Sequence, residues 1–309
     1  MTDVLEKLAP FDVLPSGLLV PGDRSISYPG NDAWLELQAQ VQDPGADPAW
    51  AMVETVPDTG AIPNKTVTAA YSNLPTISTA TSKFGGSSLL SSGASYALTT
   101  PDHADWTFGA GDFTIEGWYY CTLIRTALVT QLTAANTDRG WEFTADIMAS
   151  ANPGFTFLYS TGDGTAWEKQ ADWAYPVSNL LNTWTHQAVV RFGTALKCFV
   201  NGTQVGSDFN CGTDVLRNSG APLTIGGDAR SAGANDFRGY TDEVRISKGI
   251  ARYTSNFTPP AAAFTRDQYT VLLMHFDGPN GGTAYIDSSG QAGAPFDPGS
   301  DPAWMEVER

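Results

Sequence analysis

Basic residues are scarce in this chain. Lysine and arginine together number 17, against 33 aspartates and glutamates, and the formal net charge is −16 over 309 residues. Binding to a phosphate backbone or to an anionic bilayer depends on positive charge, so a chain of this sign would be repelled by both. The composition therefore disfavours nucleic acids and membrane surfaces as partners.

Cysteines and long apolar runs are also few. No apolar stretch approaches the roughly 20 residues of a membrane-spanning helix, and the start, Met1–Leu8, lacks the basic and apolar regions of a signal peptide. The spacing of Cys121, Cys198 and Cys211 fits neither a zinc motif nor a disulfide framework. We expect reduced, half-buried thiols in a protein made in a cytoplasm, with a Cys198–Cys211 disulfide as the open alternative.

Glycine and proline are abundant instead. The chain has 31 glycines and 19 prolines with no collagen period, while 42% of its residues are hydrophobic and 16% are charged. Such a composition suits a folded protein in which many turns join short strands. It predicts an all-β fold, and the length allows one large domain with extra segments or two ordinary domains.

Short alternating stretches recur through the middle of the chain and leave no room for long helices. Asp112–Tyr120 and Thr185–Phe192 alternate in hydrophobicity and are rich in β-branched and aromatic residues, which favours strands. Further along, Asn201-Gly202 is a pair that accepts the positive φ angles of a type I′ turn. We expect a tight hairpin there, with Val205 opposite Cys198.

The first 63 residues are predicted to form an arm with little core of its own. Eight prolines between Pro10 and Pro63 interrupt any long element. Within the arm, the pattern predicts a short helix over Asp3–Leu8 and a half-buried strand over Trp34–Val41.

One internal repeat is visible in the sequence. Asp43–Trp50 reads Asp-Pro-Gly-Ala-Asp-Pro-Ala-Trp, and Asp297–Trp304 repeats it with a single substitution. Two copies cannot form a solenoid. An acidic, proline-rich loop that ends in tryptophan offers a rigid aromatic anchor, so we interpret the copies as docking segments. A remnant of module duplication is the alternative.

Five spaced motifs resemble concanavalin A-like modules of the laminin G type. They follow the order of that family through about two-thirds of the chain: Ser82–Leu89, Phe108–Trp118, Trp184–Arg191, Phe199–Gly202 and Gly239–Thr254. The resemblance implies a two-sheet jelly-roll sandwich. The last motif is similar to those in virion proteins of bacteriophages.

A stretch near the C-terminus resembles the segment that usually opens such a module, and here it follows the domain. Residues 268–290 would complete the same domain, as in a circular permutation, or alternatively a neighbouring subunit. We favour the first, because a short connection after Pro259-Pro260 keeps strand and domain close. The predicted division is an arm at 1–63, a jelly-roll at 64–265, and a C-terminal strand and tail at 266–309.

The carboxylates do not form a catalytic pattern. Glycanases of the wider concanavalin A-like group carry two catalytic carboxylates on alternate residues of one strand, and we find no such triplet in the sequence. Asp242-Glu243 are adjacent and would point to opposite faces, while His103, His186 and His275 stand beside no nucleophile motif. We expect a protein that is not an enzyme.

The family resemblance implies a calcium ion at the rim of the sheets, held by aspartates and loop carbonyls. Asp242, Asp277 and Asp287 are the candidates on the matching motifs, since Ca²⁺ prefers carboxylate oxygens. The alternative is that these aspartates cap turns. No other cofactor is expected.

Aromatic side chains on loops are the other candidate site. Trp141, Trp167, Trp173 and Tyr175 would stack on sugars in a glycan-binding protein, and the alternative for each is packing in the core or at a subunit interface. Asp163–Trp167 is the most site-like stretch, because its tryptophan lies beside a turn.

Together these features predict a structural protein of the bacteriophage virion, as a capsid decoration or as a fibre- or tail-associated subunit. Trp34, Trp50 and Trp304 would contact other virion proteins or sister subunits of a homo-oligomer. The alternative is a carbohydrate-binding module that attaches the virion to a surface polysaccharide. A glycan-cleaving enzyme would need a carboxylate pair that the sequence does not offer.

Overall fold

The chain divides into two compact units, Met1–Ala61 and Ile62–Arg309. The computed structural model describes residues 65–70, 74–92, 97–123, 126–146, 153–227, 230 and 237–290, together with four short strands nearer the N-terminus. Those four strands form two antiparallel pairs in the first unit: β1 (Phe11–Val13) with β2 (Leu19–Pro21), and β3 (Ile26–Ser27) with β4 (Trp34–Leu35).

Several predictions for the ends of the chain fall on residues that are not described. The helix expected over 3–8, the side chain of Trp34, both copies of the repeat, and with them Trp50 and Trp304, lie outside the described residues. Strand β4 covers the first two residues of the strand predicted over 34–41.

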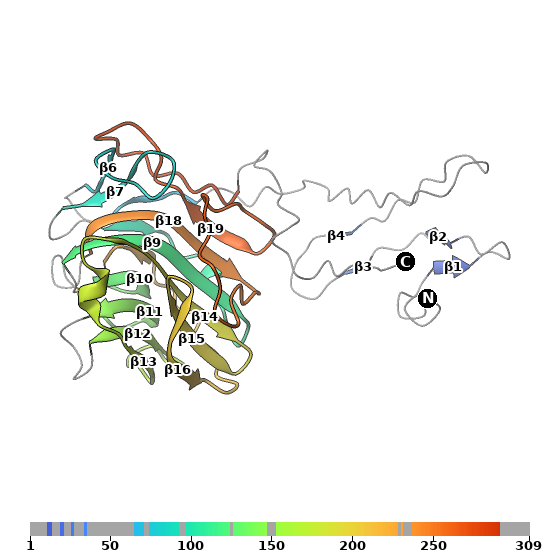
Figure 1. Ribbon diagram of the computed structural model, residues 1–309. Coiled ribbons are helices and arrows are strands. Elements are labelled where there is room, and N and C mark those ends of the chain that lie inside the picture. Colours follow the sequence, from blue (N-terminus) through green and yellow to red (C-terminus); the bar gives the residue numbers. More distant parts are fainter. Residues whose placement is uncertain are drawn as a thin grey trace, which may run out of the picture. The chain divides into compact units, whose positions relative to one another are not determined.

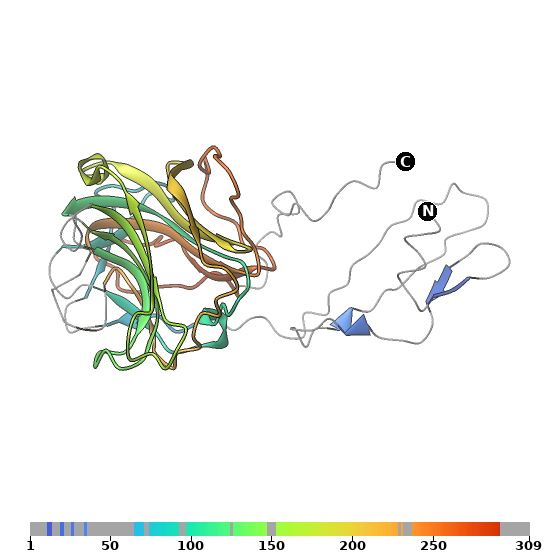
Figure 2. The same cartoon turned by 90° about the horizontal axis from the view of Figure 1, so that it is seen from below.

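The second unit contains two antiparallel sheets that face each other (Figure 1, Figure 2). The seven-stranded sheet has the order β13-β12-β11-β10-β17-β8-β5, and the eight-stranded sheet has the order β16-β15-β14-β9-β18-β7-β6, with β19 also paired to β18. The predicted all-β, two-sheet jelly-roll sandwich is confirmed. No helix among the described residues is long and apolar enough to cross a membrane.

The strands of the seven-stranded sheet are β5 (Thr68–Ala69), β8 (Leu98–Thr100), β10 (Thr126–Leu132), β11 (Arg139–Asp146), β12 (Gly154–Tyr159), β13 (Lys169–Ala174) and β17 (Leu223–Ile225). Those of the eight-stranded sheet are β6 (Thr76–Ser78), β7 (Ser88–Ser91), β9 (Phe113–Leu123), β14 (Trp184–Phe192), β15 (Ala195–Val200), β16 (Thr203–Asn210), β18 (Arg238–Lys248) and β19 (Thr270–Met274). Two 3-10 turns, η2 (Ala104–Trp106) and η3 (Val177–Leu180), accompany them.

The core lies between the sheets and follows from alternation along each strand. In β9, the side chains of Phe113, Ile115 and Tyr119 join the main apolar cluster. Because successive side chains of a strand point to opposite faces, Glu116 and Trp118 lie on the outer face of the eight-stranded sheet. The predicted strands over 112–120 and 185–192 correspond to β9 and β14.

The hairpin of β15 and β16 has the predicted geometry. Asn201 and Gly202 have φ angles of 48° and 75°, and Val205 lies opposite Cys198, so the type I′ turn sets the register. All three cysteines are free and buried. The alternative of a Cys198–Cys211 disulfide is therefore wrong.

Strand β19 completes the sandwich within its own chain. It pairs antiparallel with β18, and all five of its residues are buried. Residues that follow β19 return to the start of the described domain, where Thr66 bridges to Ile286 and the Lys65 backbone N–H donates to Asp287. Of the two arrangements considered for residues 268–290, the structure shows the intramolecular one.

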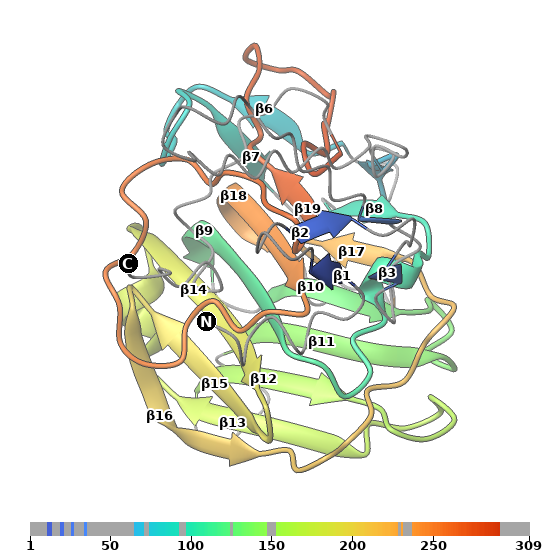
Figure 3. The ribbon, with the colours of Figure 1, turned by 90° about the vertical axis from the view of Figure 1, so that its right-hand side faces the viewer.

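The outer face of the eight-stranded sheet is covered by residues 249–267, which connect β18 to β19 and which we call the strap. Figure 3 shows this segment, in orange, crossing in front of the sheet. Tyr253 and Phe257 of the strap pack on Ala188, Val190 and Phe199, whose side chains point outward from β14 and β15. The part of this face around Ala188, Val190 and Phe199 is therefore covered by the chain itself.

Candidate functional site

A buried cluster of polar side chains lies between the strap and the eight-stranded sheet. Glu116 accepts hydrogen bonds from Arg245 Nε at 2.9 Å and from the Tyr253 hydroxyl at 2.8 Å, and its second oxygen also lies 3.0 Å from His186 Nε2. Glu116 and His186 are both fully buried. We call these four residues the Glu116 cluster.

The electrostatics of the Glu116 cluster favour an ionised carboxylate. Burial alone would raise the pKa of Glu116, but the Arg245 guanidinium, the His186 hydrogen bond and the charge of Arg252 together hold this pKa far below its ordinary value. Aromatic rings of Trp118, Tyr253, Phe257 and Phe264 surround the His186 ring within 6.1 Å. Glu116 thus fastens the strap to the sheet and is saturated with protein partners.

Strand β18 contains a bulge that alternation along the chain did not predict. The register with β9 shifts between Asp242 and Arg245, and Glu243 has a φ of 53°. Asp242 accepts from the backbone N–H groups of Lys83 and Phe84, and Glu243 accepts from that of Phe264.

Phe84 and Phe264 both pack on Trp118, so the two carboxylates reach the same side of the sheet. The expectation that Asp242 and Glu243 point to opposite faces was wrong, because the bulge adds a residue to the strand. Glu243 also binds His275 at 2.8 Å. Although burial opposes the charged form, this bond raises the pKa of His275.

Two of the three aspartates predicted to bind calcium lie near each other. The carboxylate of Asp277 lies against Gly85, where any side chain would collide with it, next to the Phe84 N–H that binds Asp242. Oδ1 of Asp242 is buried and has no hydrogen-bond partner in the described structure. Burial raises the pKa of Asp242 to about 7, and the charges of Glu243 and Asp277 add to the rise.

The third aspartate, Asp287, has a structural role. Both oxygens of Asp287 are occupied, by the backbone N–H groups of Lys65, Leu273 and Ser289 and by the Ser289 hydroxyl. This is the turn-capping role that was the alternative for these residues. No group of three or more His, Cys, Asp or Glu side chains in the described residues is arranged to hold a metal ion, so a cation at Asp242 and Asp277 would take further ligands from carbonyls and water.

Two of the tryptophans proposed as sugar contacts are part of the core. Trp141 is 0% exposed and Trp173 is 2% exposed. Their indole N–H groups donate to the backbone carbonyls of Trp106 and Ser207. The prediction that Trp141 and Trp173 stack on a glycan was wrong, because neither ring has a face in contact with solvent.

Trp167 differs from these two because it is only half-buried, on the loop between β12 and β13. The Arg139 guanidinium lies 5.6 Å from its ring centre. Hydrogen bonds within the loop and from another segment hold it in place. Within the loop, Asp163 accepts from the backbone and hydroxyl of Thr165, and from outside the loop Arg217 donates to the Gly162 carbonyl. A rigid loop thus presents one aromatic ring at the rim of the seven-stranded sheet.

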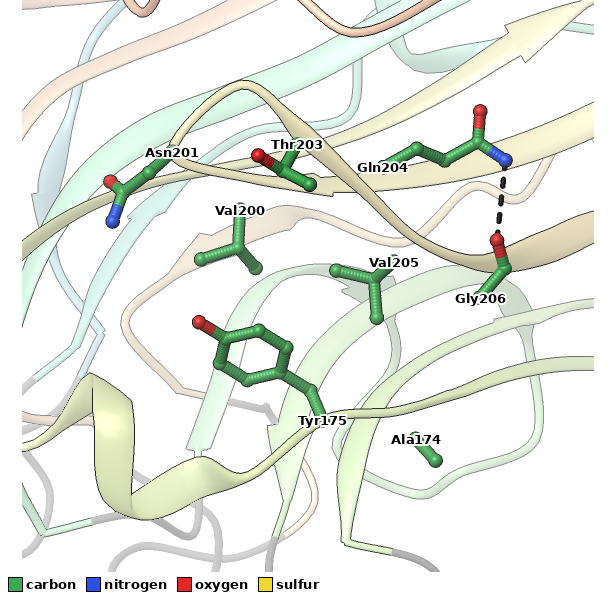
Figure 4. Close-up of a pocket in the computed structure, with 8 residues that line it drawn as sticks. All are labelled: Ala174, Tyr175, Val200, Asn201, Thr203, Gln204, Val205 and Gly206. Atoms are coloured by element: carbon green, nitrogen blue, oxygen red, sulfur yellow. Dashed lines mark hydrogen bonds between the residues drawn. The ribbon is translucent and has the colours of Figure 1, made fainter.

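Tyr175, the fourth aromatic candidate, lines a pocket at one edge of the sandwich (Figure 4). The pocket has a volume of about 470 Å³ and lies between the end of β13 and the hairpin of β15 and β16. Strands β13 and β16 are edge strands of the two sheets. The Tyr175 ring faces Val200 and Val205 across it. Asn201, Thr203 and Gln204 complete the wall on the hairpin side.

Comparison with known families agrees with this architecture. The profile of the concanavalin A-like lectin/glucanases superfamily matches residues 91–255, which is more than half of the chain. The chain belongs to this superfamily. The match spans all of β9 to β16 and both halves of the Glu116–His186 pair, and it ends within the strap.

Solved structures are similar to the chain only at low sequence identity. Domain 4 of the extracellular arabinanase AbnA of Geobacillus stearothermophilus is 19% identical, with 60% of this chain and 82% of that chain covered and a TM-score of 0.43. The carbohydrate-binding domain (CBM40) of a Ruminococcus gnavus sialidase is 16% identical, with 46% and 77% covered and a TM-score of 0.35. No curated protein matches the chain.

Proposed function

We propose that the sandwich is a lectin-like module that binds carbohydrate and carries out no catalysis. The observation that carries the proposal is Trp167, a half-buried indole on a braced loop at the rim of the seven-stranded sheet. Sugar rings present C–H groups on their faces, which pack well on a fixed aromatic ring. Membership of a superfamily that includes lectins supports the same assignment.

The state of the acidic side chains supports binding over hydrolysis. A glycoside hydrolase needs two carboxyl groups that reach a substrate, one of them able to give up a proton. Glu116 is sealed beneath the strap and bound to Arg245. Glu243 is 1% exposed and is shared between Phe264 and His275. Neither is available to a glycosidic bond.

Replacing Trp167 with alanine is expected to weaken polysaccharide binding by about 2 kcal/mol, roughly 30-fold in Kd, because a central aromatic contact commonly supplies that much. A glycan array followed by titration calorimetry on the best ligand measures it. Phe192→Ala is the matched control, since Phe192 is an aromatic side chain that is 50% exposed at the end of β14. Equal loss in both variants, or no array binding by the wild type, would refute the proposal.

We also propose that Asp242 and Asp277 hold one calcium ion. The residues fit such an ion, because Asp242 Oδ1 is buried without a partner and a second carboxylate lies beside it. A bound cation would offset the repulsion between these carboxylates and link the turn at Lys83–Gly85 to the segment that follows β19. The ion would therefore stabilise the domain without taking part in chemistry.

Calcium is expected to raise the melting temperature of the wild type after treatment with a chelator, because a ligand at 100 times its Kd adds about 2.7 kcal/mol to stability. Differential scanning calorimetry with calcium and with excess chelator measures the change. Asp242→Asn should abolish the response, whereas Asp163→Asn, on a distant exposed loop, should keep it. An undiminished response in Asp242→Asn would exclude this site.

The module would also belong to a larger assembly. We propose that it is displayed on a bacteriophage virion as a homo-oligomer made in the host cytoplasm, with the two copies of the Asp-Pro-Gly repeat contacting other virion proteins or sister subunits. The similarity of Gly239–Thr254 to virion proteins and the repeat at 43–50 and 297–304 support this placement. Cryo-microscopy of the parent particle tests it, and a particle without density for this chain would refute it.

A further inference from the structure

We propose that the pocket beside Tyr175 is a separate subsite that takes a single uncharged sugar unit. The inference rests on the proposed carbohydrate-binding function but concerns another surface than Trp167. The pocket volume of about 470 Å³ falls within the range of about 300 to 1,000 Å³ that is usual for small-molecule sites. It is bounded by the hairpin on one side and by the end of β13 on the other (Figure 4).

The wall of the pocket combines apolar and polar groups without any charge. Tyr175, Val200 and Val205 supply an aromatic ring and two branched side chains. Tyr175 is half-buried and Thr203 is exposed, so both hydroxyls can reach a ligand in the pocket. A sugar has this same division, with C–H faces for the apolar wall and hydroxyl groups for the polar one.

Charge selects against acidic sugars at this place. No lysine, arginine or histidine is among the residues that line the pocket. The nearest cation on the hairpin, Lys197, is bound to both oxygens of Asp208 at 2.8 and 2.7 Å. A uronic or sialic acid would therefore meet no cation to balance the charge of its carboxylate, in a chain whose net charge is −16.

A purely apolar ligand fits less well than a sugar. It would cover the Tyr175 and Thr203 hydroxyls without replacing their bonds to water, which is costly for buried polar groups. The side chain of Gln204 is held in the wall by its amide, which donates to the Gly206 carbonyl at 3.4 Å (Figure 4) and to Asp208 at 2.9 Å. The chemistry of the wall thus points to a small, neutral, hydroxyl-rich ligand.

The hairpin that forms one wall is held from behind by the strap. The Phe257 N–H donates to the Gly202 carbonyl at 2.9 Å, and Asn256 Oδ1 accepts from the Gln204 N–H at 2.8 Å. A side chain at Gly202 would collide with the Phe257 carbonyl. On the other side, the Trp173 indole donates to the Ser207 carbonyl and fixes β16 beside β13. The pocket is therefore formed before any ligand arrives, which lowers the entropy cost of binding.

Backbone amide shifts in an NMR titration of the full chain test the subsite. Methyl glycosides of glucose, galactose, mannose and arabinose are the probes, and methyl glucuronide is the charged counterpart. We expect at least one neutral glycoside to shift the amides of Tyr175 and Thr203–Gly206, and the glucuronide to leave them unchanged. No shift at these amides with any neutral glycoside would overturn the inference.

Substitutions at two positions test the pocket separately from the rest of the protein. Ala174 is exposed at the mouth, so Ala174→Trp should fill the pocket and weaken glycoside binding about tenfold or more, while Ala174→Ser should stay within about twofold. Thr203→Val removes one hydroxyl at nearly constant volume and should weaken binding even if Ala174→Trp does not fold. Unchanged affinity in Ala174→Trp or in Thr203→Val would contradict the subsite.

The two proposals fail in different ways. Array binding that depends on Trp167, without shifts at the pocket amides, would leave the proposed function standing and refute the subsite. Shifts of the pocket amides without any polysaccharide binding would support the subsite and refute the proposed function of Trp167. Trp167→Ala is expected to keep the pocket shifts, because its loop lies at the far end of β13 from Ala174.

Discussion

Glu116→Gln is expected to destabilise the protein by about 3–5 kcal/mol, because it leaves the buried Arg245 guanidinium without its counter-charge. The substitution conserves size and shape, so the loss reports the charge and its hydrogen bonds. Arg245 binds Glu116 twice, through Nε at 2.9 Å and Nη2 at 2.8 Å, and the Tyr253 hydroxyl of the strap adds a third bond. Urea unfolding followed by tryptophan fluorescence measures the change in the free energy of unfolding.

The effect of Glu116→Gln should depend on pH in a definite direction. Since its partners depress the pKa of Glu116 below the ordinary value of 4.5, its contribution is complete above pH 4.5 and disappears as the pH falls toward the folded-state pKa. The wild type and the variant should therefore converge in stability in acid. Glu168→Gln, on the exposed Trp167 loop, is the control and should change stability by about 0.5 kcal/mol or less. A Glu116→Gln protein as stable as that control would show that the cluster does not fasten the strap.

Single strands and the tight hairpin of this fold could be predicted from the sequence. The Asn201-Gly202 turn fixes its own hairpin, because positive φ at both positions is a property of those two residues. Strand β9 likewise followed from alternation over 112–120. The Glu116 cluster was not accessible, since its members come from β9, β14, β18 and the strap, and nothing local indicates that they meet.

The errors in the candidate site have two different physical causes. Trp141 and Trp173 were assigned to loops, yet Trp141, Phe143 and Ala145 alternate with Glu142 and Thr144 along β11, which is the period of a half-buried strand. That signal would have placed Trp141 inside. The bulge at Glu243 left no comparable trace, because it depends on the register with β9 and not on the residue type.

The prediction that residues 268–290 complete the domain, as in a circular permutation, concerned the largest part of the fold. It required only that a segment resembling the usual first strand come after the usual last one, and β19 pairs with β18 as that arrangement demands. Lys65 joins the two ends of the domain, since its Nζ lies 2.8 Å from Asp105 and donates to the Val271 carbonyl. The ends of the described domain are thus held together by a buried lysine.

Truncation of the chain after Thr265 is expected to abolish cooperative folding. It removes the buried side chains of β19 and the turn after it: Val271, Leu272, Leu273, Met274 and Phe276. At about 1.5–3 kcal/mol for each fully buried side chain, their combined contribution is comparable to the whole stability of about 5–15 kcal/mol for a typical domain. It also leaves Arg252 without Asp267, to which it donates at 2.7 Å. Circular dichroism during heating should show no sharp transition.

A permuted chain is the matched control, because it contains the same residues in another order. Residues 266–290 are placed before Lys65 through a Gly/Ser linker of about six residues, and the chain ends at Thr265. Because Thr66 already bridges to Ile286 and Lys65 binds Asp287, the linker spans a short gap and β19 reaches β18 without crossing another strand. This chain should melt cooperatively, within a few degrees of a chain of residues 65–290 in the natural order. If the truncated chain melted as sharply as the permuted one, the domain would fold without β19 and the prediction would be wrong. If only the permuted chain melts sharply, β19 is required to complete the domain, whichever end of the chain supplies it.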